Sequence, residues 1–321
     1  RLDYSGGASC PSLLLEPQRT NGFAQSEYFS ELMSTDVDIT IDVNAAASPD
    51  GLQNSARLNF NSANRSMYRA VNFAGQHTYS FYLKAEGSNI GKTFNFRLRD
   101  TSSVAVNHSV PLTGEWVRHD FQFSDSNLME FTNREGTTIA DGSILLWGIQ
   151  IEAGSYPTSY IPTMGSAVTR SKEQCNVNNV TGEIGQTQGT IFLDADLYKK
   201  TDTEFFIAIS NGTLSNSIYL HQSSQSLLVN KRISGATEVL QVTSANWSSG
   251  RNKCAITYTA TEMKIYINGV LKDTESISGL PSGLSKLTLG SRQDNLGELA
   301  SDANYKQSIV FPTALTDSEC I

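Results

Sequence analysis

Several features that mark other classes of protein are scarce in this chain. Only 17% of its 321 residues are charged, the net charge is −8, and no run of Lys or Arg stands out. Because neutralising phosphates requires clustered cations, nucleic-acid binding is not expected. No apolar run approaches the about 18 residues that a membrane helix needs, so membrane insertion is not expected either.

Cysteine is also sparse and widely spaced. The four cysteines are Cys10, Cys175, Cys254 and Cys320, and no two of them have C-x-x-C spacing. This spacing argues against a zinc or redox site and favours buried thiols, although one or two disulfides remain open. No Gly-x-Ser-x-Gly elbow or phosphate-binding loop is present.

The residues that are abundant in the chain are those typical of short strands joined by turns. Apolar residues make up 39% of the chain, and much of the remainder is Ser, Thr, Asn and Gly. The length favours two domains over one core. We predict an all-β protein with two antiparallel β-sandwich (jelly-roll) domains in tandem, at 22–163 and 164–321. An irregular leader at 1–21, broken by Gly and Pro, precedes them.

Period-two alternation supports this organisation. In residues 79–85 apolar and polar side chains alternate, and 190–198 places Ile191, Leu193, Ala195 and Leu197 on one face. Asn268-Gly269 lies between two strand-like runs and predicts a type I′ hairpin turn. Near the end, Thr316 followed by Glu319 predicts a short capped helical turn.

The stretch from Leu145 to Arg170 is predicted to close the first domain and link it to the second. Its alternation places Trp147 on one face with Leu145, Ile149 and Ile151, which predicts a core tryptophan. His119 is in phase with Val117 and Phe121, and is likewise expected to be a core histidine rather than a ligand.

The second half resembles the concanavalin A-like lectin/glucanase superfamily in its laminin G-like form. The residues that carry this resemblance are Lys264 to Leu271 (KIYINGVL), Leu287 to Ser291 (LTLGS), and Tyr305 through Ala314 to Glu319 (ALTDSE). In that superfamily the corresponding segments form a late hairpin, an inner strand, and the last strand with its small helical end.

Three segments of the first half are similar to jelly-roll carbohydrate-binding modules of bacteriophage virion proteins. They are Phe81 to Gly87, Leu112 to Arg118 and Leu146 to Gly154, and the leader phrase from Leu13 to Asn21 resembles what precedes such modules. The resemblance implies a receptor-binding, spike or fibre protein located on the virion surface.

Sugar recognition requires aromatic faces and planar polar side chains. In the first domain Tyr82, Arg97 and Arg99 occupy polar-facing strand positions, and Tyr68 and Arg69 could join them. In the second domain the glycan-binding candidates are Tyr219, His221, Arg292 and Asn295. The competing interpretation is that these residues only cover solvent-facing sheet and turns.

The resemblance to laminin G-like domains also implies that calcium could be held at one rim, with Asn211, Asn216 and Asp294 as candidate ligands. Ordinary turn chemistry accounts for the same residues. No other cofactor is predicted.

Enzymatic activity is not expected. Asp194 and Asp196 lie two residues apart on one strand face, as a pair of glycosidase carboxylates could, but the glucanases of the superfamily carry a Glu-containing catalytic strand that this sequence lacks.

Three hypotheses follow. The favoured one is a non-enzymatic virion surface protein that binds host surface polysaccharide. The alternatives are a structural fibre or capsid-decoration protein, and a polysaccharide hydrolase. Other virion proteins are expected partners, and a homo-oligomer is expected, with a trimer favoured.

Overall fold

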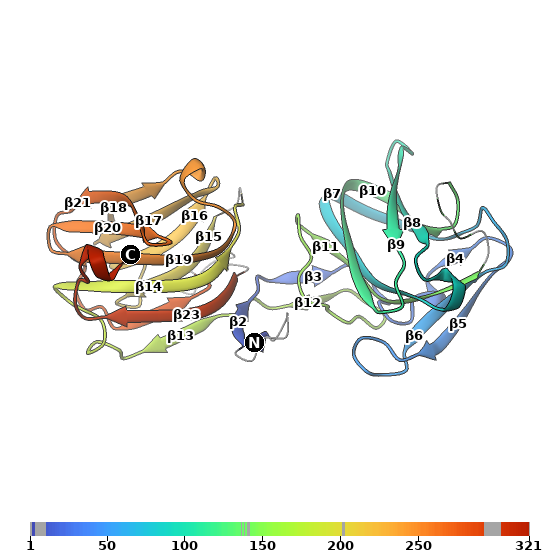
Figure 1. The fold of residues 1–321 in the computed structure, drawn as a ribbon, viewed down its shortest axis with the longest axis horizontal. Helices are drawn as coiled ribbons and strands as arrows, with labels where there is room; N and C mark the ends of the chain where they lie inside the picture. Colours follow the sequence, from blue (N-terminus) through green and yellow to red (C-terminus); the bar gives the residue numbers. More distant parts are fainter. Residues whose placement is uncertain are drawn as a thin grey trace. The chain divides into compact units, whose positions relative to one another are not determined.

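A computed structural model of the chain describes residues 2–3, 11–135, 137, 139, 142–200, 203–291 and 303–320. The chain divides into a central unit, residues 19–170, and a split unit formed by residues 1–18 and 171–321 (Figure 1). The described residues form strands, turns and short 3-10 segments without an α-helix, which confirms the predicted all-β class. Among them, no helix has the length and hydropathy to span a membrane.

The central unit contains one eight-stranded antiparallel sheet in the order β5-β6-β11-β7-β10-β8-β9, with β4 paired to β7. Its strands are β4 (Ser34–Thr35), β5 (Ile39–Ala46), β6 (Ser55–Phe60), β7 (Ser66–Ala85), β8 (Thr93–Asp100), β9 (Ala105–Pro111), β10 (Val117–Thr132) and β11 (Gly142–Ala153). A separate pair joins β3 (Arg19–Asn21) to β12 (Val168–Arg170), and the 3-10 turns are η2 (Phe29–Glu31) and η3 (Gly87–Asn89).

Two long strands fold this sheet into a sandwich. The register between β7 and β10 shifts around Ser124 to Leu128, where Gly75 and Asp125 both have positive φ and the Gly75 N–H donates to the Asp125 carboxylate at 2.7 Å. The bulge lets each strand contribute to both layers. The first layer is β5-β6-β11 with the C-terminal half of β7 and the N-terminal half of β10, and the second is β4 with the other halves, β8 and β9.

Aromatic contacts between strands of the two layers form the core of the central unit. Phe60 of β6 packs on Phe94 of β8 at 5.3 Å between ring centroids, and Phe81 of β7 packs on Phe96 of β8 at 4.7 Å. Edge-on and tilted ring pairs at such distances add to the hydrophobic gain of burial.

The split unit is a second sandwich, made of two antiparallel sheets in the orders β1-β2-β23-β14-β19-β20-β21 and β13-β22-β15-β16-β17-β18. The first sheet comprises β1 (Leu2–Asp3), β2 (Ser12–Leu15), β14 (Gln188–Leu197), β19 (Gly250–Thr259), β20 (Glu262–Ile267), β21 (Val270–Ser276) and β23 (Ala303–Phe311). The second comprises β13 (Cys175–Asn178), β15 (Glu204–Ser210), β16 (Ser217–Ser223), β17 (Ser226–Ile233), β18 (Ala236–Val242) and β22 (Lys286–Leu289), and the 3-10 turns are η4 (Ser244–Asn246) and η5 (Asp317–Glu319).

Several local predictions are confirmed in the split unit. The apolar face of β14 enters the core as the alternation of 190–198 predicts. Asn268 and Gly269 have φ of 51° and 76°, as a type I′ turn between β20 and β21 requires. At η5 the Glu319 carboxylate accepts hydrogen bonds from the Thr316 N–H at 2.8 Å and from its hydroxyl at 2.7 Å.

The N-terminal segment differs from the expected irregular leader. Residues 12–15 form β2, which pairs with β23, and Leu15 is only 3% exposed in the core of the split unit. Residues 19–21 form β3, which pairs with β12 in the central unit. The glycines and prolines of this segment exclude a long regular element, but they allow short strands. Such strands form by pairing with segments far away in the chain, which the local sequence does not reveal.

Trp147 is buried as predicted, with 3% exposure, but its predicted face is wrong. Gly148 has φ of 67° and the register of β11 shifts between Trp147 and Gln150. This bulge reverses the phase of the strand, so Ile144 and Leu146 join Ile149 and Ile151 in the core. Trp147 instead packs against Tyr82 and Tyr160, with centroids 5.4 and 4.4 Å away.

Of the cysteines, Cys175, Cys254 and Cys320 are free, and Cys254 is buried as the prediction of buried thiols requires. Cys175 and Cys320 are only partly buried. Cys10 lies outside the described residues.

Candidate functional site

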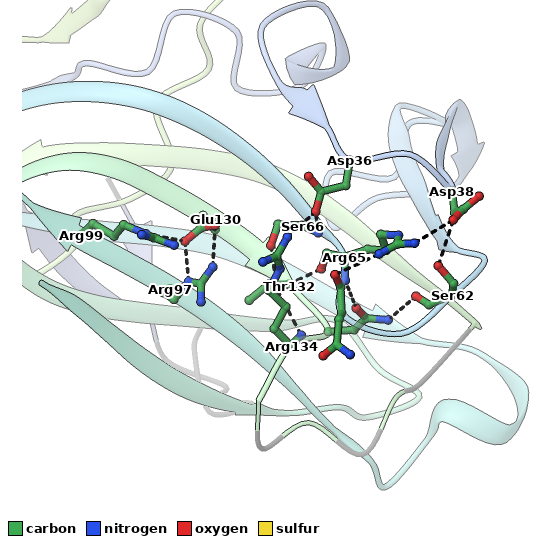
Figure 2. Close-up of polar contacts among 12 residues, drawn as sticks. Asp36, Asp38, Ser62, Arg65, Ser66, Arg97, Arg99, Glu130, Thr132 and Arg134 are labelled. Carbon is green, nitrogen blue, oxygen red and sulfur yellow. Dashed lines mark hydrogen bonds and ion pairs between the residues drawn. The ribbon is translucent and has the colours of Figure 1, made fainter. Parts of the chain in front are cut away.

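A buried carboxylate on β10 organises two of the predicted arginines. Glu130 accepts a hydrogen bond from Arg97 Nη2 at 2.7 Å and a further one from Arg97 Nε, and it accepts one from Arg99 Nε at 3.1 Å. Figure 2 shows both guanidinium groups directed at Glu130. The Arg97 and Glu130 side chains are 7% and 6% exposed, whereas that of Arg99 is 33% exposed.

The electrostatics keep this cluster charged. Burial raises the pKa of Glu130, but the hydrogen bonds and charge of Arg97, with a smaller contribution from Arg99, outweigh burial and hold that pKa below its usual range. The hydrogen bond to Glu130 raises the pKa of Arg97. With one carboxylate between two guanidinium groups, the cluster keeps a local excess of positive charge.

Tyr68 is placed beside this cluster by strand register. Tyr68 of β7 lies opposite Glu130 of β10, and Glu130 lies opposite Arg97 of β8. Directly opposed residues of antiparallel strands share a face, so these three side chains form one row on the outer face of the second layer. Tyr68 is half-buried. The structure therefore brings together Tyr68, Arg97 and Arg99.

Further polar contacts secure the loops next to the row (Figure 2). Arg134 Nη2 contacts Asp36 Oδ2 at 2.6 Å, and the same carboxylate oxygen accepts a hydrogen bond from the Ser66 N–H at 2.9 Å. Arg65 contacts Asp38 at 3.0 Å. These pairs hold the ends of β7 and β10 on which Tyr68 and Glu130 stand. Arg69, the other residue that could join the set, donates to the Leu32 carbonyl at 2.7 Å.

Tyr82 is not part of this row, which corrects the predicted grouping with Arg97 and Arg99. It belongs to the half of β7 in the first layer, where it pairs with Arg118 and Trp147. The Arg118 guanidinium lies 5.7 Å from the centroid of the Tyr82 ring. The two halves of one long strand belong to different layers, and alternation within β7 does not reveal that bend.

Tyr219 and His221 are brought together in the split unit, but inside a packed cluster. They are 4% and 8% exposed, and the centroid of the Phe205 ring lies 5.2 Å from that of Tyr219 and 5.3 Å from that of His221. Asn230 donates to the Tyr219 hydroxyl at 3.0 Å, and its Oδ1 lies 3.3 Å from His221 Nε2. Burial lowers the pKa of His221. Leu214 packs against Phe205 and Tyr219, so the Tyr219 ring is covered although it lies on an outward strand face.

The amides of Asn211 and Asn216 stabilise turns. Asn211 Oδ1 accepts hydrogen bonds from the N–H and hydroxyl of Thr213 at 3.1 and 2.7 Å, and Asn216 Oδ1 accepts one from the Ser234 N–H at 3.2 Å. Across the described ranges no group of three His, Cys, Asp or Glu side chains is arranged to hold a metal. Arg292, Asp294 and Asn295 lie outside the described residues, so calcium binding stays a prediction.

The two aspartates considered for hydrolysis are both ion-paired. Asp194 accepts two hydrogen bonds from Arg251, at 2.9 and 2.7 Å, and these bonds hold the pKa of Asp194 below its usual range. Asp196 lies 3.2 Å from the Lys306 ammonium.

Two residues of these clusters, Glu130 and Arg118, were not predicted from the sequence. Glu130 lies in the part of β10 beyond Phe123, where the strand was predicted to end. The alternation of Met129 and Phe131 with Glu130 and Thr132 is the signal that indicates its outward position. Arg118 also occupies an outward position, but its position over Tyr82 depends on the pairing of β7 with β10.

The chain was compared with known proteins. No protein-family model and no curated protein matches it. Solved structures similar to part of the chain include the NanB sialidase from Streptococcus pneumoniae, with 17% identity over 45% of this chain and 25% of that chain and a TM-score of 0.39. Another is the receptor-binding domain of botulinum neurotoxin C/D mosaic serotype, with 16% identity over 46% and 39% and a TM-score of 0.38. The binding domain of botulinum neurotoxin DC in complex with rat synaptotagmin II has 15% identity over 47% and 39% and a TM-score of 0.37. Each match covers less than half of either chain.

Proposed function

We propose that this chain is a non-enzymatic glycan-binding protein of a bacteriophage surface, which contacts host polysaccharide through the outer face of β7, β10 and β8. The observation that carries the proposal is the row of Tyr68, Glu130 and Arg97 with Arg99 beside it. Within the described part of the chain, Nε is the one Arg99 nitrogen with a protein partner, so its terminal nitrogens are left to bridge sugar hydroxyls or a sugar carboxylate.

Preorganisation supports this assignment. Arg97 and Glu130 are buried and fixed by each other, and Glu130 in turn orients Arg99, which therefore loses less side-chain entropy when it binds. The half-buried Tyr68 supplies an aromatic ring on β7, opposite Glu130. Such a shallow face binds weakly at one site, and repeated copies on a particle would compensate. The proposed assembly is a homo-oligomer, with a trimer favoured, bound to other virion proteins.

The virion part of the proposal rests on the resemblance of the leader, of residues 81–87 and of residues 146–154 to phage proteins. Binding without hydrolysis is favoured by Asp194, because a carboxylate whose pKa is lowered by a guanidinium is a poor general acid.

Direct binding to host polysaccharides on a glycan array tests the glycan assignment. We expect selective binding by the full chain. Arg99→Ala should weaken it about ten- to hundredfold, since a hydrogen bond to a charged group is worth about 1.5–3 kcal/mol, and Tyr68→Ala about two- to tenfold, since an aromatic contact is worth about 0.5–1.5 kcal/mol. Arg232→Ala, which removes a half-exposed arginine from the split unit, is the matched control.

Uniform binding to every host glycan, or undiminished binding by both variants, would contradict the glycan assignment. Electron microscopy of the particle with the chain labelled tests the virion assignment separately. A location inside the capsid would overturn it.

A further inference from the structure

A groove with a volume of about 490 Å³ opens on the first layer of the central unit, away from every residue in the Tyr68 row. It is lined by Thr40, Asn59, Phe60, Asn61, Gly142 and Ser143. These residues come from β5, β6 and β11 and from the residue that follows β6. The volume falls within the about 300–1,000 Å³ of ordinary small-molecule sites.

Strand register aligns the polar lining. Thr40 of β5 lies opposite Asn59 of β6, and Asn59 lies opposite Ser143 of β11. Opposed residues share one face, so a hydroxyl, an amide and a second hydroxyl follow one another at about 4.8 Å per strand. Phe60 is 1% exposed and packs in the core, so it does not offer its ring to the groove.

The central amide is already oriented. Asn59 Nδ2 donates to Thr40 Oγ1 at 3.1 Å and to Asp42 Oδ2 at 3.0 Å. With both amide protons directed at fixed acceptors, Asn59 Oδ1 is held in one orientation as an acceptor. Asn61, which is exposed and follows β6, adds a second amide to the lining.

The charge of the groove limits the class of ligand. None of the six lining residues is ionisable. The exposed Asp42 carboxylate, which accepts the Asn59 amide, lies at one edge of the row, and the Arg57 guanidinium is taken up by Glu86 at 2.9 and 3.1 Å. A row of hydroxyls and amides matches a neutral polyol, whereas an anionic ligand would find no counter-charge among the lining residues and would lie near the Asp42 carboxylate.

We propose that this groove is a second carbohydrate-binding site, which takes one or two units of an uncharged glycan. It is separate from the Arg99 site, whose excess guanidinium charge suits acidic sugars, and it does not depend on that site being functional. One site for uncharged sugars and another for acidic sugars on the same unit would let the chain bind the neutral and the acidic residues of a host polysaccharide at once.

Affinity electrophoresis of the full chain tests the groove, with gels that contain dextran, mannan or galactan as neutral probes and polygalacturonate as the acidic probe. We expect at least one neutral polysaccharide to retard the chain. Asn59→Ala should weaken that retardation about five- to tenfold, because it removes the oriented acceptor and frees Thr40 and Asp42. Ser143→Trp, which fills the groove, should do the same, and neither of these two variants should change the retardation by polygalacturonate.

The control is Thr274→Val on β21 of the split unit, an exposed strand threonine remote in sequence from the groove. Circular dichroism establishes that each variant is folded, and Asn59→Ala decides the outcome if Ser143→Trp is not. The proposal is overturned if no neutral polysaccharide retards the full chain, or if a folded Asn59→Ala binds as strongly as the unaltered chain. Loss of acidic binding in Arg99→Ala alone bears on the function proposed above and leaves the groove intact.

Discussion

At the scale of single residues, the Glu130 carboxylate of the central unit is buried, where desolvation disfavours its charged form. Glu130 is 6% exposed, and it remains ionised because two guanidinium groups offset its desolvation. The same contacts hold Arg99 at the surface. Stability and the proposed binding face therefore depend on one carboxylate.

Removing that carboxylate should be costly. We expect Glu130→Ala to lower the free energy of unfolding of the central unit by about 3–5 kcal/mol, because it leaves the Arg97 charge buried without a partner. Urea denaturation measures this change. The double variant Glu130→Leu with Arg97→Met should recover most of the loss, since it removes both charges. A loss below about 1 kcal/mol in Glu130→Ala would show that Arg97 finds water or another partner.

At the scale of elements, distant segments and bulges determine which faces are available. The bulge at Gly148 turns Trp147 away from the core, and the bend of β7 separates Tyr82 from Tyr68. Strand β2 likewise depends on a segment far away in the sequence, since Leu13 pairs with Tyr305 of β23 and Leu15 pairs with Ala303.

The N-terminal strand should therefore matter to the split unit alone. We expect Leu15→Ala to destabilise that unit by about 2–5 kcal/mol, because Leu15 is buried in its core. Hydrogen exchange with mass spectrometry should show faster exchange in β14 and β23 and unchanged exchange in β7 and β10. Leu2→Ala, at an exposed position in the same segment, serves as the control. Equal exchange in Leu15→Ala and the unaltered chain would mean that β2 is dispensable.

At the scale of the whole molecule, one buried and two partly buried histidines and the ion-paired carboxylates couple stability to pH. Burial lowers the pKa of His108, His119 and His221 in the folded chain. The unfolded chain, in which a histidine has a pKa of about 6.5, then binds protons more readily. Stability from these residues is fully present above about pH 6.5 and is lost as the pH falls from that value through the lowered pKa values of the folded chain.

Acid should thus destabilise the chain in two stages, first below about pH 6.5 and again below about pH 4, as carboxylates such as Glu130 and Asp194 with lowered pKa values take up protons. Urea denaturation between pH 7.5 and 3 measures both stages. His221→Phe keeps an aromatic ring beside Phe205, and it should reduce the slope between pH 7 and 5.5. An unchanged slope in this variant would exclude His221 as a contributor.

Much of the architecture was predictable from the sequence by itself. Period-two alternation identified the strands of two sandwiches, Asn268-Gly269 predicted its hairpin turn, and Thr316 with Glu319 predicted the capped turn at the end. These succeed because each depends on residues that are neighbours along the chain, where backbone preference and side-chain spacing act directly.

The candidate sites depended on tertiary structure. The sequence placed Arg97 and Arg99 on one outward face, but only the pairing of β8 with β10 brought Glu130 between them. Only the bend of β7 and β10 removed Tyr82 from that face, and only the alignment of β5, β6 and β11 put Thr40, Asn59 and Ser143 in one row. Alternation determines which side chains of one strand share a face, whereas strand neighbours, bulges and bends are set by packing between residues far apart in the chain.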